Sequence, residues 1–455
     1  MLEIYNPATD KHLLTIENDS KKEIADKFAK AKAALSQWSQ TSLETRLTAI
    51  KKFRSAVVEQ KNTLARILTN EMGKPISQST QELNGLLTRI DFFLEETPRV
   101  LEIEVVSDSV ATVTEKISKE PLGVIANISA WNYPYFVGSN VFIPALLTGN
   151  TVLYKPSEFA SITGTAITQL LHDSGIPEDV FILVVGDGKV GEELLKLPFD
   201  GVFFTGSYAT GKKINRAVSE HFTKVQLELG GKDPFYVCDD VEIKTAAAGL
   251  ADGAFYNNGQ SCCSVERIYV HDSIYEKFCT HFVEEVKKFV IGDPLNEKTY
   301  IGPLTQPAQI KFLQSQVADA IAKGAKLVCG GKAMARAGNY FEPTVLTDVT
   351  HEMNVMMEES FGPIIGIQSV KDDLHAIQLM NDTAYGLTAG VYTLKKERAE
   401  SILKQLNAGS VYWNVCDRVS PKLPWSGRGN SGMGCTLSHY GIETFLKLKA
   451  WHLKA

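Results

Sequence analysis

Gly123-Val124-Ile125-Ala126-Asn127-Ile128 opens the part of the chain that decides the fold, a series of short apolar strands alternating with helical segments. Branched and aromatic side chains fill three further strands of this kind, at residues 151–154, 181–185 and 201–204. Such strands, separated by helices, are typical of a doubly wound parallel sheet with both faces covered. These sheets bind ligands at the carboxyl ends of their strands, which is where we expect a site.

The length and composition describe an ordinary globular protein. A chain of 455 residues is too long for one core and predicts two or three domains. The net charge of −6 is mild and no dense basic cluster is present, which argues against a nucleic-acid partner. Seven scattered cysteines without CxxC spacing indicate neither a disulfide framework nor a metal site, and favour a reducing compartment.

No targeting signal is evident in the sequence. The N-terminus, Met1-Leu2-Glu3-Ile4-Tyr5-Asn6-Pro7, has neither the basic start nor the apolar run of a secretory signal. No stretch approaches the ~18 apolar residues of a membrane span. We therefore expect a cytoplasmic protein without a membrane partner.

The first hundred residues follow a helical period after a turn at Asn6-Pro7. Thr41-Ser42-Leu43-Glu44 predicts a capping box at the start of one helix, and Met72-Gly73-Lys74-Pro75 the end of another. From residue 102 to 120 the period changes to two, which predicts a hairpin with its turn at Ser107-Asp108-Ser109. The strands of this hairpin are polar and short, so it needs a partner.

Two adjacent thiols occur in Phe255-Tyr256-Asn257-Asn258-Gly259-Gln260-Ser261-Cys262-Cys263. Asn-Asn-Gly is a turn-forming tripeptide that would carry a thiol out of regular structure. Backbone N–H groups freed in such a loop can stabilise a thiolate or an oxyanion. On this stretch alone, two small buried hydrophobes are the commoner outcome for unpaired cysteines.

A carboxylate stands beside glycines in Gln226-Leu227-Glu228-Leu229-Gly230-Gly231-Lys232-Asp233-Pro234. The alternating strand delivers Glu228 into a Gly-Gly turn, which lets another group approach closely. In type, order and separation, the two stretches match Glu-Leu-Gly-Gly-Lys and Gly-Gln-x-Cys. The chain thus resembles the aldehyde dehydrogenase superfamily along essentially its whole length.

This resemblance implies the chemistry of the site. Cys262 would attack an aldehyde carbon, and Glu228 would activate the water that hydrolyses the resulting thioester. Asn132, in Trp131-Asn132-Tyr133-Pro134, would stabilise the oxyanion with the Cys262 backbone N–H, although the same stretch alone is an ordinary turn. Cys263 would serve packing or line the substrate pocket. Two alternatives remain: transfer of the acyl group to coenzyme A or phosphate, and a catalytically silent structural member, against which Cys262, Glu228 and Asn132 argue.

The resemblance also implies an α/β fold in three parts. Residues 1–101 and 122–229 would form a doubly wound dinucleotide-binding domain, and residues 230–425 a second α/β catalytic domain. Residues 102–121 and 426–455 would form a small β oligomerisation arm and a C-terminal strand. In the family the arm pairs with the C-terminal strand of another subunit, here about residues 444–451, which implies a homodimer or a dimer of dimers, that is, a homotetramer.

The cofactor implied is NAD, with NADP as the alternative. The family pattern places its contacts on Ile128, Trp131, Lys155, Ser157, Glu158, Gly188, Thr205, Gly206, Ser207, Leu229, Glu359 and Phe361. Residues 186–191 also fit GxGxxG, but the next strand ends in Thr205-Gly206 rather than in the acid of the dinucleotide fingerprint. A carboxylate at Glu158 would accept ribose hydroxyls and repel the extra phosphate of NADP, which favours NAD.

The C-terminal region departs from the family pattern. Pro-Phe-Gly-Gly-x-Lys is replaced by Pro424-Trp425-Ser426-Gly427-Arg428-Gly429, and Ser-Gly-x-Gly-Arg-Glu by Ser431-Gly432-Met433-Gly434-Cys435-Thr436. Tyr133, Tyr256 and Trp425 favour an apolar or aromatic aldehyde. A semialdehyde, as in an NADP-preferring semialdehyde dehydrogenase, would want an arginine, for which Arg418 and Arg428 are the nearest candidates in sequence. The substrate stays open between these two classes.

Overall fold

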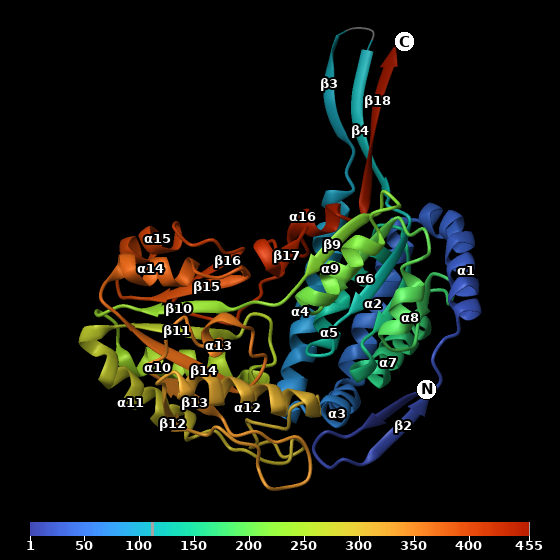
Figure 1. Cartoon of the computed structure of the whole chain (residues 1–455). Coiled ribbons are helices and arrows are strands. Elements are labelled where there is room, and N and C mark those ends of the chain that lie inside the picture. The colour runs from blue at the N-terminus through green and yellow to red at the C-terminus, as the bar shows by residue number, and fades with distance from the viewer. Residues whose placement is uncertain (111–112, 455) are drawn as a thin grey trace.

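A computed structural model describes residues 1–110 and 113–454. Its first large sheet has the strand order β17-β9-β8-β5-β6-β7 and is parallel except for β17 (Figure 1). The strands are β5 (Val124–Ser129), β6 (Thr151–Pro156), β7 (Phe181–Leu183), β8 (Gly201–Thr205), β9 (Lys224–Glu228) and β17 (Gly432–Met433). The chain order reverses beside β5, so the predicted doubly wound sheet is confirmed and has its crevice there.

Helices accompany this sheet on both sides, as its apolar strands require. They are α5 (Pro134–Val137), α6 (Ser139–Leu147), η1 (Glu158–Ala160), α7 (Ser161–Asp173), α8 (Gly188–Leu194) and α9 (Tyr208–Ala217). The N-terminal region adds the hairpin β1 (Leu2–Tyr5) and β2 (His12–Ile16) and the helices α1 (Lys21–Gln40), α2 (Leu43–Glu59), α3 (Lys61–Met72) and α4 (Ile76–Val100). Gly73 ends α3 in the left-handed conformation, as predicted.

The predicted capping box at residues 41–44 is wrong. Helix α2 starts one residue later than that pattern implies, with Ser42 as its N-cap accepting a hydrogen bond from the Thr45 backbone. A reciprocal capping box is present at the start of α1, between Ser20 and Glu23. Both caps satisfy backbone N–H groups that would otherwise lack acceptors.

The second large sheet has the order β12-β13-β14-β11-β10-β15-β16 and is parallel except at β12. Its strands are β10 (Asp233–Val237), β11 (Val265–His271), β12 (Lys326–Cys329), β13 (Thr344–Thr347), β14 (Ile364–Val370), β15 (Thr388–Tyr392) and β16 (Ser410–Trp413). Its helices are α10 (Ile243–Phe255), η2 (Tyr256–Gly259), η3 (Asp272–Ile274), α11 (Tyr275–Val286), α12 (Pro307–Ala322), α13 (Asn354–Met357), α14 (Asp373–Asn381) and α15 (Lys396–Leu403). The second α/β unit that the resemblance implied is thus present.

The third sheet is an arm that projects from the body of the molecule (Figure 1). It contains β3 (Glu104–Val110), β4 (Val113–Pro121) and β18 (Leu446–Lys454) in the order β18-β4-β3. Residues 107–109 lie within β3, so the turn predicted there is wrong, and the connection falls at residues 111–112, outside the described residues. Strand β4 pairs with β18 of its own chain, so the predicted pairing with another subunit's C-terminal strand is also wrong.

The rest of the C-terminal segment returns to the first large sheet. It forms η4 (Gly429–Ser431), β17 and α16 (Ser438–Glu443). Gly432 of β17 lies opposite Glu228 of β9 in an antiparallel pair. The sequence did not predict this pairing, and it places the C-terminal segment beside the candidate base.

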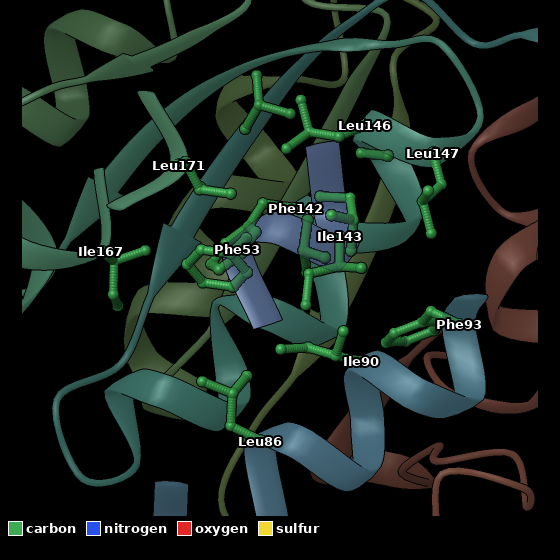
Figure 2. Close-up of a cluster of buried hydrophobic side chains, with 14 of the residues drawn as sticks. Phe53, Leu86, Ile90, Phe93, Phe142, Ile143, Leu146, Leu147, Ile167 and Leu171 are labelled. Atoms are coloured by element: carbon green, nitrogen blue, oxygen red, sulfur yellow. The ribbon is translucent and has the colours of Figure 1, made fainter. Parts of the chain in front are cut away.

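A buried apolar cluster fixes the helices around the first sheet (Figure 2). Phe53 of α2, Ile90 of α4, Phe142 of α6 and Ile167 of α7 are each at most 1% exposed. Cys263 belongs to the same cluster, so apolar packing ties the thiol loop to these helices. No helix in the described ranges is long and apolar enough to cross a membrane.

Candidate active site

Three consecutive left-handed residues create the thiol loop. Helix α10 ends at Phe255, and Asn257, Asn258 and Gly259 follow with φ values of 52°, 61° and 66°. Asparagine and glycine tolerate this conformation best. A Cβ on Gly259 would lie 2.3 Å from the Gly362 carbonyl oxygen, so only glycine fits there. The loop therefore leaves the helix sharply, as the turn tripeptide predicted.

The two thiols that follow have different surroundings. Cys262 remains partly exposed, whereas Cys263 is buried. The Cys263 thiol donates to Asp417 Oδ1 at 3.1 Å. Its pKa is raised well above the ordinary value by a hydrogen bond with the Cys262 thiol, by burial and by the charge of Asp417. Cys263 is therefore held as a thiol, and Cys262 is the accessible sulfur of the pair.

Asn132 follows β5 and lies against the thiol loop. Its Nδ2 donates to the Gln260 carbonyl at 3.1 Å, and Asn257 Nδ2 donates to the Asn132 carbonyl at 3.3 Å. An amide nitrogen carries two hydrogens, so one remains for an oxyanion. The Cys262 backbone N–H likewise has no acceptor in the part of the chain that the structure describes, so it is also free to donate to an oxyanion.

Two buried charged residues support the Asn132 segment, and sequence reasoning missed both. Lys74 forms an ion pair with Glu82, and both side chains are fully buried. Lys74 Nζ also donates to the Asn132 carbonyl at 2.8 Å, and Glu82 Oε1 accepts from the Tyr135 backbone at 2.9 Å. Losing either member would leave the other charge buried and unpaired. The Gly-Lys-Pro pattern after α3 predicts only the end of that helix and does not indicate this role.

Glu228 is the last residue of β9 and is 5% exposed. Its Oε1 accepts from Gln226 Nε2 at 3.0 Å and from the Thr436 hydroxyl. Burial raises the pKa of Glu228 to about 7, against the lowering effect of these two hydrogen bonds and of Arg89. A carboxyl group with this pKa can exchange a proton near neutrality, as a general base must.

The glycines after Glu228 bring its strand to the thiol loop. A Cβ on Gly231 would lie 2.7 Å from the Cys262 carbonyl oxygen, so the Gly-Gly turn runs directly against that loop. Glu359 occupies the other side of the turn, where its Oε1 accepts from the Gly231 backbone at 3.0 Å. The nucleophile, base and amide candidates thus come from three segments that contact one another.

The strand register gathers most predicted cofactor residues at one edge of the first sheet. Ile128 of β5 is level with Lys155 of β6 and Phe204 of β8, and Thr205 is level with Glu228. Adjacent strand ends in a parallel sheet form one continuous edge. These residues, far apart in sequence, therefore lie along a single edge of the sheet.

The groups at this edge have the hydrogen-bonding capacity that a dinucleotide needs. Lys155 is 3% exposed, and its Nζ makes one hydrogen bond, to the Pro156 carbonyl at 3.3 Å. Burial lowers the pKa of this amino group. The carboxylate of Glu158 accepts from Ser157 Oγ at 3.2 Å, which leaves it further acceptor capacity. A buried cation with unused donors fits ribose hydroxyls.

Two helix starts provide room for the polar backbone of such a ligand. Gly188 begins α8 in open space, with nothing within 4 Å of a Cβ built on it. Ser207 caps α9, and among the described residues the Tyr208 and Ala209 backbone N–H groups have no acceptor. Such N–H groups attract phosphate. The Gly206 N–H instead donates to the Glu228 carbonyl at 3.0 Å, and Leu229 packs where a Cβ on Gly211 would fall.

Glu359 and Phe361 lie on the opposite wall, in the loop before β14. Glu359 is partly buried, and its Oε2 has no hydrogen-bond partner in residues 1–110 and 113–454. The Phe361 ring meets the Trp131 ring edge to face at 5.5 Å between centroids. Glu266, buried with Lys232 in an ion pair, accepts from the Phe361 backbone at 3.0 Å and fixes this loop. Sequence reasoning missed Glu266.

Another residue that sequence reasoning missed is Arg89 of α4. It is 5% exposed, its guanidinium lies 3.8 Å from the centre of the Phe136 ring, and its Nε donates to Asn140 Oδ1 at 3.1 Å. Burial lowers the pKa of Arg89 to about 10, against the opposing effect of nearby Glu82 and, more weakly, of Cys263 and Glu228. Arg418 and Arg428, the candidates from sequence, are exposed. The helical periodicity of the sequence alone does not show whether Arg89 is buried or lies on the surface.

Comparison with known proteins points to a single family. The family model described as "Aldehyde dehydrogenase family" matches residues 1–451. A succinate-semialdehyde dehydrogenase [NADP(+)], GabD of Escherichia coli K12, is 34% identical over 450 residues, covering 98% of this chain and 93% of that protein. Aminoaldehyde dehydrogenase 1, peroxisomal, of Pisum sativum is 33% identical over 455 residues, covering 98% and 90%.

Solved structures agree over the whole fold. An E. coli NADP-dependent enzyme superposes with a TM-score of 0.97 at 33% identity, covering 100% of this chain and 95% of that one. Betaine aldehyde dehydrogenase of Staphylococcus aureus in complex with NAD+ superposes with a TM-score of 0.96 at 30% identity, covering 99% and 91%.

Proposed function

Because the chain belongs to the aldehyde dehydrogenase family and oxidises an aldehyde to a carboxylate with NAD(P), we propose that Cys262 is its nucleophile and Glu228 its hydrolytic base. The observation that carries this proposal is the contact between the Gly-Gly turn after Glu228 and the Cys262 carbonyl. It brings a carboxyl group with a pKa of about 7 to the loop of the accessible thiol.

The residues then act in sequence. The Cys262 thiolate attacks the aldehyde carbon, and the Asn132 amide and the Cys262 backbone N–H donate to the oxygen that becomes negative. When bound, the nicotinamide accepts the hydride that this carbon loses. The thioester left on Cys262 is cleaved by water that Glu228 deprotonates, which releases the acid and restores the Cys262 thiolate.

The chain's own groups would hold the dinucleotide across the crevice. We infer that Lys155, Ser157 and Glu158 bind one ribose, with Ile128 beside them. The Thr205–Ser207 turn and the start of α8 at Gly188 would take the phosphates, supported by Leu229. Glu359 would bind the second ribose, and Phe361 and Trp131 would flank the ring. We further propose that residues 1–101 and 122–229 form the dinucleotide domain and residues 230–425 the catalytic domain.

Glu158 is the residue on which a preference for NAD depends. A carboxylate next to the ribose would repel the additional phosphate of NADP. Replacing Glu158 by Gln should therefore raise the ratio of kcat/KM for NADP to that for NAD by about tenfold, roughly 1.4 kcal/mol. Steady-state kinetics with both cofactors measure this ratio. Glu192→Gln removes an exposed charge on α8 and should leave it unchanged; an unchanged ratio in both variants would contradict the assignment.

A semialdehyde is the second candidate substrate, and Arg89 favours it. A semialdehyde would want an arginine for its distal carboxylate, and Arg89 is buried and has guanidinium N–H groups beyond those that bond Asn140 and Gly85. The side chains of Tyr133 and Phe136, stacked at 5.7 Å between ring centroids, favour the apolar alternative. Relatives that act on succinate semialdehyde and on aminoaldehydes are about equally similar to this chain.

Oxidation of a panel of aldehydes tests the function and separates these substrates. Succinic semialdehyde and butanal differ chiefly in one carboxylate, so absorbance of the reduced cofactor should show which is preferred. If Arg89 binds a carboxylate, Arg89→Met should lower kcat/KM for the semialdehyde by about 10- to 100-fold and leave butanal nearly unaffected. Equal losses for both would assign Arg89 a structural role. Product formation that requires coenzyme A would overturn hydrolysis.

The arm supports a proposal about assembly. Val105 and Leu448 are 60% and 73% exposed, and β3 and β18 are the edge strands of the arm. Exposed edge strands of this length need covering, so we infer a homodimer or a dimer of dimers. Sedimentation equilibrium would give the mass directly. The seven free cysteines agree with a reducing, cytoplasmic location.

A further inference from the structure

We propose that Thr436 and Gln226 are positioning residues for Glu228, which they hold by one carboxylate oxygen so that the other oxygen takes the proton of the attacking water. This inference rests on the proposed function, because it assigns the base a defined reacting atom. It also accounts for the segment in which the chain departs from the family pattern, where threonine stands in place of glutamate.

The two oxygens of Glu228 are not equivalent. Oε1 accepts both hydrogen bonds, from Gln226 and from Thr436. Oε2 has no hydrogen-bond partner in the part of the chain that the structure describes, and it keeps some exposed surface, so water can reach it. A carboxylate fixed at one oxygen cannot rotate its second oxygen freely. Oε2 is therefore the proton acceptor.

The backbone explains why Thr436 lies over a residue 208 positions earlier. Leu229 N–H donates to the Ser431 carbonyl at 3.0 Å, and β17 continues this pairing along β9. Gly434, with φ at 85°, leaves no room for a side chain against Gln226. Thr436 and Trp425 then exchange two backbone hydrogen bonds, of 2.8 and 2.9 Å. The hydroxyl is thus placed by backbone contacts that do not depend on it.

The charges around Glu228 determine how the hydrogen bonds from Gln226 and Thr436 affect its ionisation. Arg89 of α4 lowers the pKa of Glu228. Among the described residues the Cys435 thiol also lies near Glu228, and burial raises the pKa of that thiol to about 11, so it stays neutral. Threonine and glutamine stabilise the carboxylate without adding charge. A glutamate at position 436 would instead place a second negative charge beside the first. The observed pair therefore keeps Glu228 ionised to lower pH.

The step that these residues serve is balanced. Glu228 Oε2 takes a proton from water while the water oxygen forms a bond to the thioester carbonyl carbon. The carbon–sulfur bond then breaks, its electron pair leaves with sulfur as the Cys262 thiolate, and the carboxylic acid departs. Oε2 returns its proton to solvent, to which it has access.

A substrate that needs no nicotinamide isolates this step. The purified full-length protein reacts with p-nitrophenyl acetate, and the phenolate absorbance separates acylation of Cys262, seen as a burst, from deacylation, seen as the steady rate. The steady rate is measured against pH for the wild type, Thr436→Val, Thr436→Ser and Gln226→Met. Valine keeps the shape of threonine and all its backbone bonds. Thr97→Val, at a buried threonine of α4 whose hydroxyl lacks a partner, is the matched control.

We expect Thr436→Val and Gln226→Met each to move the midpoint of the deacylation profile to higher pH, with about tenfold slower deacylation at neutral pH and an unchanged burst. Accumulated acetyl-enzyme should appear by mass spectrometry. Thr436→Ser should restore the wild-type midpoint, and Thr97→Val should retain it. A rate that falls equally at all pH values, or an unmoved midpoint, would overturn the positioning role. Absence of any burst in the wild type would instead overturn the nucleophile assignment.

Discussion

Replacing Cys262 by alanine will lower kcat/KM for aldehyde oxidation by more than about a thousandfold, because the neighbouring thiol, Cys263, is buried and cannot form the thioester in its place. The measurement is reduced-cofactor absorbance at saturating NAD, with cofactor binding checked separately by fluorescence. Cys262 is partly exposed, and the truncated side chain leaves the loop geometry set by Asn257, Asn258 and Gly259 unchanged. An unchanged melting temperature would show that the variant is folded, so that the loss of kcat/KM comes from the missing nucleophile.

Cys263 provides the matched control for this prediction. Its thiol is buried, donates to Asp417 and has a raised pKa, so it stays protonated and away from the aldehyde. Cys263→Ala should keep kcat/KM within a few-fold while lowering stability by about 1 kcal/mol, as expected for a small buried side chain. Iodoacetamide should label Cys262 first in the wild type. An inactive Cys263→Ala with an active Cys262→Ala would reverse the two roles.

Replacing Glu228 by glutamine should slow thioester hydrolysis by about 100- to 10,000-fold, the range that a positioned general base contributes. Glutamine keeps the shape and can still meet the Thr436 hydroxyl, so the loss reports the missing base. The signature is a burst of reduced cofactor about equal to the enzyme concentration, followed by a slow steady rate. A variant that turned over at the wild-type rate would show that water is activated elsewhere.

Glu228 also determines how the rate of thioester hydrolysis depends on pH. The pKa of Glu228 is raised to about 7 by burial, so the basic form is the minor one below pH 7 and the major one above it. The hydrolytic rate should therefore rise with pH through a midpoint near 7 and level off above it. In Glu228→Gln this limb should vanish. A midpoint near the ordinary carboxyl value would indicate a base that is exposed to water.

The sequence patterns correctly predicted the structural features that depend mainly on residues close together in the chain. Apolar strands of period two and their intervening helices were sufficient for the doubly wound sheet, because burial on both faces leaves few alternatives. The Asn-Asn-Gly turn likewise predicted the thiol loop. The turn predicted at Ser107-Asp108-Ser109 is wrong because turn-forming residues also occur within strands, as they do in β3.

Contacts between distant segments could not be predicted in this way. Lys74 is 58 residues from Asn132, and Thr436 is 208 residues from Glu228; no periodicity connects either pair. The resemblance supplied the nucleophile, base and amide but not their supports, because the segment that contains Thr436 departs from the family pattern. The burial of Arg89 in the amphipathic helix α4 depends on packing against distant segments, which the sequence of the helix does not show.

The antiparallel pairing of β17 with β9 also bears on biosynthesis. Ribosomes deliver the thiol and its carboxylate long before residues 431–436 emerge. A nascent polypeptide could thus display a reactive sulfur while its water-activating partner still lacks the hydroxyl donor. Enzymatic competence would begin only after residues 431–436 have joined the sheet, so their deletion should be far more damaging than the modest share of polypeptide removed would suggest.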